Sequence, residues 1–306
     1  MTPFPKTIAV VGAGALGSYY GAKLARQGAE VRFLMRADLE AVRQNGLRVR
    51  EQGEEWSVPV QAFGSTAEIG LVDLVIIGLK TTANGDLEKL IPPLLHEGTL
   101  LLTLQNGLGN EELLAERWGA ERVLGGLCFV CLNRVAPGVV EHYGHGTLSL
   151  GEYGRAPVER TEAIGAQFSA AGVETHVVEN LITERWRKLV WNIPFNGLSI
   201  ATGGRTCDRL LADAGLRKQV RGLMAETIAA AGALGHAIPE SFIDFQIERT
   251  YSMGPYKPSS MIDWQQGRAV EVESIWGEPW RQGRAAGAKL PRLELLYLLL
   301  REVTSR

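Results

Sequence analysis

Short apolar runs and longer segments with helical spacing alternate along the first half of the chain. The apolar runs are rich in β-branched residues, which predicts strands, and most gaps between them show the periodicity of an amphipathic helix. A parallel sheet covered by helices requires this order of elements. The expected strands are residues 7–11, 30–34, 74–79, 99–104 and 122–127.

Two other segments, 47–62 and 139–150, alternate apolar and polar residues at every second position, and a short strand-like run follows at 175–178. Within residues 47–62 two such runs flank the sequence Glu-Gln-Gly-Glu-Glu at 51–55, which predicts a hairpin inserted at the edge of the sheet. Residues 139–150 and 175–178 are expected to close the sheet as antiparallel strands.

After about residue 179 the pattern changes to long helices, such as 216–234 and 292–303, the latter following Pro291 at a helix-start position. The chain has 306 residues, about twice the usual domain size. We therefore expect two domains, 1–179 and 180–306, of which the second is all-α.

Composition narrows the possible functions. The apolar fraction of 45% and charged fraction of 22% are those of a globular protein, and 32 basic against 34 acidic residues do not favour nucleic-acid binding. The apolar runs are far shorter than the ~20 residues of a membrane-spanning helix. With only three cysteines and no signal-peptide pattern at the start, we expect a cytoplasmic protein without membrane partners. Cys128 and Cys131 have a redox-like spacing, but burial in a strand over 126–135 explains both thiols.

The sequence Gly12-Ala13-Gly14-Ala15-Leu16-Gly17 directly follows the first strand and opens a helix. The first glycine permits a tight turn, the second lets a pyrophosphate approach the backbone, and the third lets the helix pack on the strand. The unpaired amides at the helix start then face the anion. This motif predicts an α/β fold with an N-terminal Rossmann-type doubly wound sheet that binds a dinucleotide, followed by the helical domain.

The end of the second strand indicates which dinucleotide binds. NAD enzymes usually place a carboxylate there to hold the ribose 2′-hydroxyl, whereas this strand ends in Phe33-Leu34-Met35-Arg36. A guanidinium can bind a 2′-phosphate, so Arg36, with Arg32 as a second candidate, predicts NADP(H). Lys80 and the sequence Gln105-Asn106-Gly107 follow two further strands and are expected at the same edge of the sheet.

Candidate chemistry in the helical half comes from Lys188, Asn192 and Asn196, which lie four residues apart among apolar neighbours. This spacing places all three on one face of a helix, in which Pro194 predicts a kink. Because burying an unpaired amide or ammonium costs several kcal/mol, the face must meet water, polar partners or a polar ligand. Further on, Ser260 precedes Glu271 in a polar segment.

In combination these residues resemble the ketopantoate reductase (2-dehydropantoate 2-reductase) family over essentially the whole chain. The matching motifs are the turn at 12–17, Arg36, Leu79-Lys80-Thr81, Gln105-Asn106-Gly107, Gly138-Val139-Val140 with His142, Trp186-Arg187-Lys188 with Asn192 and Asn196, and Ser259-Ser260-Met261 ahead of Glu271.

The resemblance implies NADPH-dependent reduction of 2-dehydropantoate to pantoate, a step of pantothenate and coenzyme A biosynthesis, in a cleft between the two domains. It implies that Lys188 is the general acid and Glu271 its partner carboxylate. The implied substrate-binding residues are Asn106, Asn192, Asn196 and Ser260, and the implied cofactor-binding residues are 12–17, Arg36, Lys80 and Asn106.

Two positions depart from the family pattern. Gly197 stands where relatives commonly have proline, and the spacing from Ser260 to Glu271 is one residue shorter than usual. Since members of the broad family reduce other 2-oxo acids, reduction of another 2-oxo acid is an alternative function.

Two rival functions share some of these motifs: an oxidative β-hydroxyacid dehydrogenase of the 6-phosphogluconate type and a non-catalytic NADPH-binding protein. His142 and His145 have a metal-like spacing but no third ligand nearby, so no metal is expected. The expected partner is a small-molecule 2-oxo acid, and the protein is expected to be a monomer or a homodimer.

Overall fold

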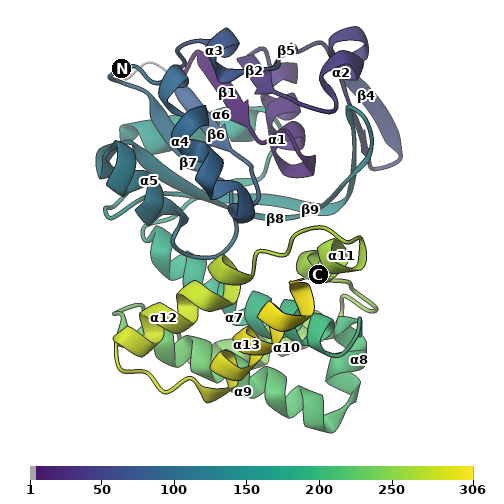
Figure 1. Ribbon diagram of the computed structural model, residues 1–306, viewed down its shortest axis with the longest axis vertical. Helices are drawn as coiled ribbons and strands as arrows, with labels where there is room; N and C mark the ends of the chain where they lie inside the picture. The colour runs from purple at the N-terminus through teal and green to yellow at the C-terminus, as the bar shows by residue number, and fades with distance from the viewer. Residues whose placement is uncertain (1–4, 306) are drawn as a thin grey trace. The chain divides into compact units, whose positions relative to one another are not determined.

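The computed structural model describes residues 5–305, which divide into two compact units. Unit 1 holds the described residues up to Gln105 together with Asn110–Leu181. Unit 2 holds Asn106–Gly109 and the described residues from Ile182 onward. Figure 1 shows the strands in the first unit, purple to teal, and the helices of the second in green to yellow.

A ten-stranded sheet forms the centre of unit 1, in the order β4-β3-β9-β8-β7-β6-β1-β2-β5, with β10 beside β9. The strands are β1 (Thr7–Val11), β2 (Glu30–Leu34), β3 (Leu47–Glu51), β4 (Glu54–Val58), β5 (Gln61–Phe63), β6 (Leu74–Ile77), β7 (Leu100–Thr103), β8 (Val123–Ala136), β9 (Val139–Glu152) and β10 (Thr175–Val177). From β5 to β8 every neighbouring pair is parallel. Because β1 lies between β2 and β6, the strand order reverses at β1, and its carboxyl end is where such sheets bind ligands.

Helices cover both faces of this sheet. Ile8 and Val10 of β1 belong to one apolar core with the helices on that face, whereas Ala9 and Val11 belong to a second core on the other face. This confirms the doubly wound fold. The helices and turns of unit 1 are α1 (Ala15–Arg26), α2 (Leu39–Asn45), α3 (Thr66–Ile69), η1 (Thr81–Asp86), α4 (Leu87–Leu90), η2 (Pro92–Leu94), α5 (Asn110–Trp118), η3 (Ala120–Arg122) and α6 (Glu159–Ala170).

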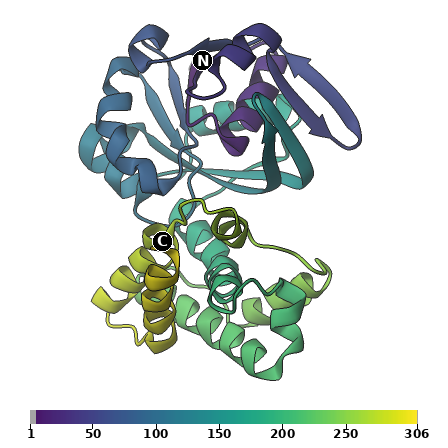
Figure 2. The ribbon, with the colours of Figure 1, turned by 45° about the vertical axis from the view of Figure 1, so that its right-hand side comes forward.

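The predicted hairpin is confirmed as β3 and β4, which are antiparallel. Its turn residues Gln52 and Gly53 have φ values of 54° and 83°, as a tight two-residue hairpin turn requires. Strand β3 pairs with β9, and β4 forms the edge of the sheet (Figure 2).

Two sequence predictions about the closing strands need correction. Strand β9 is antiparallel to β8 as expected, but β10 pairs parallel to β9, because α6 carries the chain back before β10 begins. Cys128 is buried, but Cys131 is only half-buried, so strand burial does not account equally for both thiols. A spacing of three residues turns side chains to opposite faces of a strand, and the pairing of β8 is irregular between the two cysteines and again directly after Cys131. Neither cysteine is in a disulfide.

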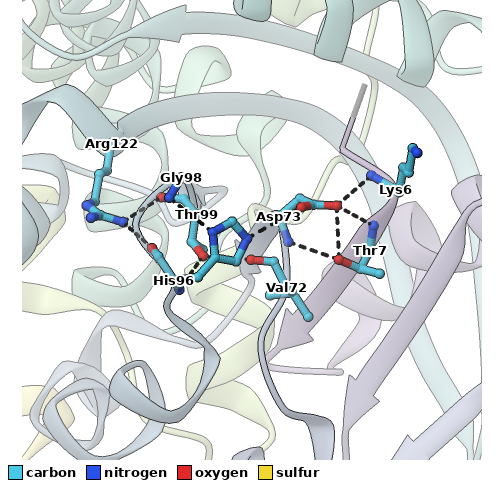
Figure 3. A network of polar contacts seen from close by, with 8 residues as sticks. All are labelled: Lys6, Thr7, Val72, Asp73, His96, Gly98, Thr99 and Arg122. Carbon is cyan, nitrogen blue, oxygen red and sulfur yellow. Dashed lines mark hydrogen bonds and ion pairs between the residues drawn. The ribbon is translucent and has the colours of Figure 1, made fainter. Parts of the chain in front are cut away.

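A network of polar contacts joins β1, β6 and β7 at their amino ends (Figure 3). The Asp73 carboxylate accepts hydrogen bonds from the backbone amides of Lys6 and Thr7, and lies 3.4 Å from Nε2 of His96. The other ring nitrogen of His96 accepts the Gly98 amide at 3.0 Å. Since both ring nitrogens are engaged at the edge opposite the glycine turn, this histidine–aspartate pair is structural.

Unit 2 is all-α, as predicted. It comprises α7 (Leu181–Ala201, whose first residue belongs to unit 1), α8 (Cys207–Ala212), α9 (Ala214–Ala233), α10 (Ser241–Tyr251), α11 (Ser259–Gln265), a π-helix η4 (Glu273–Gly277), α12 (Glu278–Ala285) and α13 (Pro291–Thr304). Trp186 and Trp276 are fully buried in its core. Among residues 5–305, none of the helices combines the length and the apolar character needed to cross a membrane.

Candidate functional site

The turn between β1 and α1 needs glycine at two positions for steric reasons. Gly12 has a φ of 101°, and a Cβ there would stand 2.3 Å from the backbone nitrogen of Leu79. A Cβ on Gly17 would stand 2.3 Å from the carbonyl oxygen of Gly12, so this glycine lets α1 pack closely on β1. Both contacts involve backbone atoms, which cannot move aside as a flexible side chain can.

Gly14 differs, because nothing lies within 4 Å of where its Cβ would be. It is the N-cap of α1, no side chain caps the helix there, and the first turn contains no acidic residue. The amide groups at this helix end therefore face open space with a positive partial charge. An uncapped helix start with open space beside its first glycine fits the pyrophosphate of a dinucleotide.

Arg36 lies two residues beyond the end of β2 and is exposed. Within the described part of the chain its guanidinium makes no hydrogen bond or ion pair, so it is available to an anionic ligand. Arg32, the second candidate, is different. It donates to the carbonyl oxygen of Ile69 at the end of α3 at 2.7 Å and to the Glu30 carboxylate at 2.5 Å, so its guanidinium is already bound within unit 1.

One acidic residue near the end of β2 has no counterpart among the sequence predictions. Asp38, the N-cap residue of α2, is 7% exposed. Arg134 Nη1 donates to its Oδ1 at 2.6 Å, and the Gly138 amide donates to its Oδ2 at 3.1 Å. No sequence signal marked it, because its partners lie about a hundred residues further along the chain.

Amide side chains connect two turns at the carboxyl edge of the sheet. Lys80 is exposed at the start of η1, after β6. Within the same turn, Asn84 accepts a hydrogen bond from Gln105 at 2.7 Å and donates one to Asn110 at 3.1 Å. Gln105 and Asn110 border the loop that follows β7 and carries Asn106, so η1 is tied to both ends of that loop.

In unit 2 the central contact joins Lys188 to Asn106. The ammonium of the half-buried Lys188 on α7 donates to Oδ1 of Asn106 at 2.9 Å. The loop of Asn106 is anchored on the π-helix, since the Leu108 amide donates to the Ser274 carbonyl at 2.9 Å. A Cβ on Gly107 would stand 2.2 Å from that same carbonyl oxygen, so only glycine permits this close approach. Asn106 therefore has a fixed position facing Lys188.

The structure also joins two of the predicted substrate-binding residues. Oδ1 of Asn196 accepts the backbone amide of Ser260 at 2.9 Å, and both residues are almost fully buried. This bond fixes α11 to α7. Asn192 is half-buried on α7 between Lys188 and Asn196. Helix α7 continues without a break through Pro194.

Glu271 is 5% exposed and immediately precedes the turn of helix that leads into η4. An ion pair between Asp263 and Arg268 joins the end of α11 to the segment before Glu271. The Arg268 guanidinium donates to the Asp263 carboxylate at 2.9 Å. The Arg268 amide also donates to the Asp263 carbonyl at 2.8 Å. The position of Glu271 is therefore set from both sides, by this ion pair and by η4. π-Helical turns are frequent at functional sites.

Gly197 has a packing explanation in this chain. A Cβ at this position would stand 2.7 Å from a methyl carbon of Leu296 and 2.8 Å from Nε1 of Trp276. The same indole nitrogen donates to the carbonyl oxygen of Ile193 at 3.0 Å. The space that a larger residue would need is thus filled by α13 and η4, which pack closely on α7.

The two histidines with metal-like spacing have other contacts. His142 Nε2 contacts the carbonyl oxygen of His145 at 2.8 Å, and His142 Nδ1 lies 3.6 Å from the Glu51 carboxylate. Across residues 5–305, no group of three or more histidine, cysteine or acidic side chains is arranged to hold a metal ion.

Comparison with known proteins gives consistent results for both halves of the chain. The family model for ketopantoate reductase PanE/ApbA matches residues 8–155, and the model for its C-terminal part matches residues 180–304. The chain is 41% identical to a 2-dehydropantoate 2-reductase from Nostoc sp., over 97% of this chain and 95% of that protein. It is 31% identical to one from Mesorhizobium japonicum, over 97% of each chain.

A solved structure has nearly the same fold. The crystal structure of 2-dehydropantoate 2-reductase from Geobacter metallireducens is 47% identical in sequence and aligns with a TM-score of 0.94. The alignment covers 97% of this chain and 100% of that one.

Proposed function

Because this chain belongs to the ketopantoate reductase family, we propose that it reduces 2-dehydropantoate to pantoate with NADPH, using Lys188 as the general acid. It is an NADP-dependent oxidoreductase acting on a CH-OH group. The contact that carries the proposal for Lys188 is its 2.9 Å hydrogen bond to Asn106, which aims a half-buried ammonium along a fixed direction.

The cofactor would be held by residues of unit 1. The amides of the 12–17 turn would bind the pyrophosphate, and Arg36 would bind the 2′-phosphate with a charge-assisted hydrogen bond. Lys80 adds a second cation at the same edge of the sheet. When bound, the reduced nicotinamide supplies the hydride that reaches C2 of the substrate.

Lys188 would donate the proton that completes the reduction. Addition of a hydride to C2 makes the carbonyl oxygen an alkoxide, which an ammonium stabilises and then protonates. The product is the 2-hydroxy acid, and the neutral amine left on Lys188 regains a proton from water, which its partial exposure permits. The Asn106 oxygen keeps the ammonium in one orientation through this cycle.

The remaining residues would position the substrate and the acid. We propose Glu271 as the partner carboxylate of Lys188, which the family resemblance implies and which its burial in the same unit supports. Asn192, Asn196 and Ser260 would orient the substrate carboxylate and distal hydroxyl. Since Oδ1 of Asn196 is occupied by the Ser260 amide, the Asn196 side-chain NH2 and the Ser260 hydroxyl are the groups left to donate.

The proposed setting is the cytoplasm, which three cysteines without a disulfide support. The proposed partner is a single small-molecule 2-oxo acid, bound by a monomer or a homodimer.

NADPH oxidation against a panel of 2-oxo acids tests the proposal. The panel contains 2-dehydropantoate, pyruvate and 2-oxoisovalerate, which lacks the hydroxymethyl group that carries the distal hydroxyl. We expect kcat/KM to be highest for 2-dehydropantoate. A higher value for another acid would identify a reductase of that acid, and binding of NADPH without turnover on any acid would contradict an enzymatic role.

A further inference from the structure

The buried carboxylate of Asp38 lies close in sequence to Arg36, the residue proposed to bind the 2′-phosphate of NADPH. Asp38 is two residues beyond Arg36 and four beyond the end of β2. In dinucleotide-binding folds an acidic residue in this region accepts the ribose 2′-hydroxyl of NAD and repels a 2′-phosphate. This chain therefore contains both the cation that favours NADPH and an anion that would oppose it.

The anion is withdrawn from any ligand by two contacts. Oδ1 is held by Arg134 at 2.6 Å and Oδ2 by the Gly138 amide at 3.1 Å, while the Asp38 side chain is only 9% exposed. Arg134 lies near the end of β8, and Gly138 lies in the turn to β9. The turn also packs against α2, since a Cβ on Gly138 would stand 2.9 Å from a methyl carbon of Val42.

The backbone of the same loop is anchored at both ends. The Met35 amide donates to the Phe63 carbonyl of β5 at 3.0 Å, and the Asp38 carbonyl accepts the Val42 amide at 2.9 Å. Between these anchors Arg36 is exposed, whereas Asp38 is turned inward. The loop thus presents its cation outward and buries its anion against the β8–β9 turn.

We propose that Arg134 and the β8–β9 turn determine the preference for a 2′-phosphorylated dinucleotide by sequestering the Asp38 carboxylate. The inference rests on the proposed use of NADPH and adds the contacts that keep the Asp38 carboxylate away from the cofactor. Arg134 is a positioning residue, because it acts through Asp38. Without Arg134 a carboxylate would remain in the interior with one hydrogen-bond donor, and its most favourable escape is outward, toward Arg36 and the bound ribose.

A double-mutant cycle tests this inference through cofactor binding, without a measurement of activity. We would measure the Kd values of NADPH and NADH by calorimetry for the unmodified chain, Arg134→Met, Asp38→Asn and the double variant. Methionine keeps much of the length of arginine without its charge, and asparagine can still accept the Gly138 amide. Arg50→Ala, which breaks an exposed ion pair with Glu55 in the same sheet, is the control for loss of a surface arginine.

We expect Arg134→Met to weaken NADPH binding about 10-fold and to leave NADH binding unchanged or tighter, because a like charge then faces the 2′-phosphate. Asp38→Asn added to this variant should restore NADPH binding to within about twofold of the unmodified chain, since the repelling charge is gone. If Arg134→Met does not stay folded, Arg134→Lys carries the test. Lysine retains the charge but not the fork of donors, so we expect a smaller selective loss that Asp38→Asn again removes.

Two results would overturn the inference. Equal weakening of NADPH and NADH would mean that Arg134 only supports the fold, and a selective loss that Asp38→Asn does not repair would mean that Arg134 acts without Asp38. Failure of the proposed preference for NADPH is distinguishable from these results, because the unmodified chain would then already bind NADPH and NADH with equal affinity.

Discussion

The proposed cofactor half of the site lies in unit 1 and the proposed catalytic half in unit 2, and the two halves are built from different parts of the polypeptide. In unit 1 the proposed pyrophosphate site consists of backbone amides, and the residues that would form it lie within six consecutive positions, 12–17. In unit 2 the site consists of side chains, and the contact between Lys188 and Asn106 joins positions 82 residues apart. A site made of backbone is encoded locally, whereas a site made of side chains depends on how distant segments pack.

This difference predicts how each half responds to the substitution of a side chain. Backbone amides cannot be removed by substitution, so the cofactor half changes gradually when a side chain is lost. The catalytic half depends on single functional groups, and losing one removes a chemical step.

Lys188→Ala should therefore have the largest effect on activity. Loss of the proton donor is expected to lower kcat by about 10² or more, the usual scale for a general acid. Binding of NADPH should persist, because the 12–17 turn and Arg36 are unchanged. Steady-state kinetics with 2-dehydropantoate and a separate NADPH titration measure the two effects, with Lys218→Ala, an exposed lysine on α9, as the control. Turnover close to that of the unmodified chain would refute the role of Lys188.

Arg36→Ala should have a smaller and selective effect. We expect the KM for NADPH to rise about 10-fold, equivalent to ~1.4 kcal/mol, with little change in kcat or in the KM for NADH. The amides of the glycine turn remain available to the pyrophosphate in both cofactors. Arg50→Ala serves as the matched exposed arginine. If the unmodified chain already uses NADH as well as NADPH, the argument from the 2′-phosphate is wrong.

Gly197→Ala tests the packing that supports the catalytic helix. The added methyl would press on Leu296 and Trp276, and such overpacking costs about 1–3 kcal/mol of unfolding free energy. Gly232→Ala is the matched control, because it lies exposed in α9 with nothing within 4 Å of its Cβ position. There we expect a gain of about 0.5–1 kcal/mol from helix propensity. Urea unfolding of both variants makes the comparison, and equal stabilities would exclude close packing at residue 197.

A pH-dependent prediction concerns Glu152, a buried carboxylate in unit 1. Burial alone would raise its pKa, but hydrogen bonds from Arg160 and Thr161, with help from Arg155, outweigh burial and hold the pKa below its usual value. Because the folded pKa is depressed, the stabilisation is fully present above the unfolded pKa, about 4.3, and is lost as the pH falls through the folded value. The difference in unfolding free energy between the unmodified chain and Glu152→Gln should therefore be largest near neutral pH and shrink in acid. A difference independent of pH would show that Glu152 is not ionised in the fold.

Much of the fold was predictable because its signals are local. The apolar strands, the glycine turn and the hairpin at Gln52 and Gly53 each follow from a few neighbouring residues. The antiparallel direction predicted for β10 is wrong, because pairing depends on the path of the preceding helix and not on the strand's own sequence. Strand β8 extends to Ala136, nine residues beyond the prediction at 127, through an irregular pairing with β9 that weakens the alternating pattern.

The candidate site also contains residues that local sequence predicts and residues that it does not. The proposed roles of Lys188, Asn106 and Glu271 rest on the family resemblance, since an isolated carboxylate or lysine on a helix is usually solvated. Asp38 was not recognised, because burial of an aspartate is explained only by partners such as Arg134, 96 residues away. The amide contacts of Asn84 likewise join segments that no local pattern relates.

The short excursion of Asn106–Gly109 into unit 2 has a consequence for dissecting the molecule. A fragment beginning at Ile182 would contain Lys188 and nearly all of α7 but lack the oxygen that orients the ammonium, and Leu108 would be missing from the helical core. The helical half is thus not an autonomous module, and exchanging it between relatives would require transplanting these four residues with it.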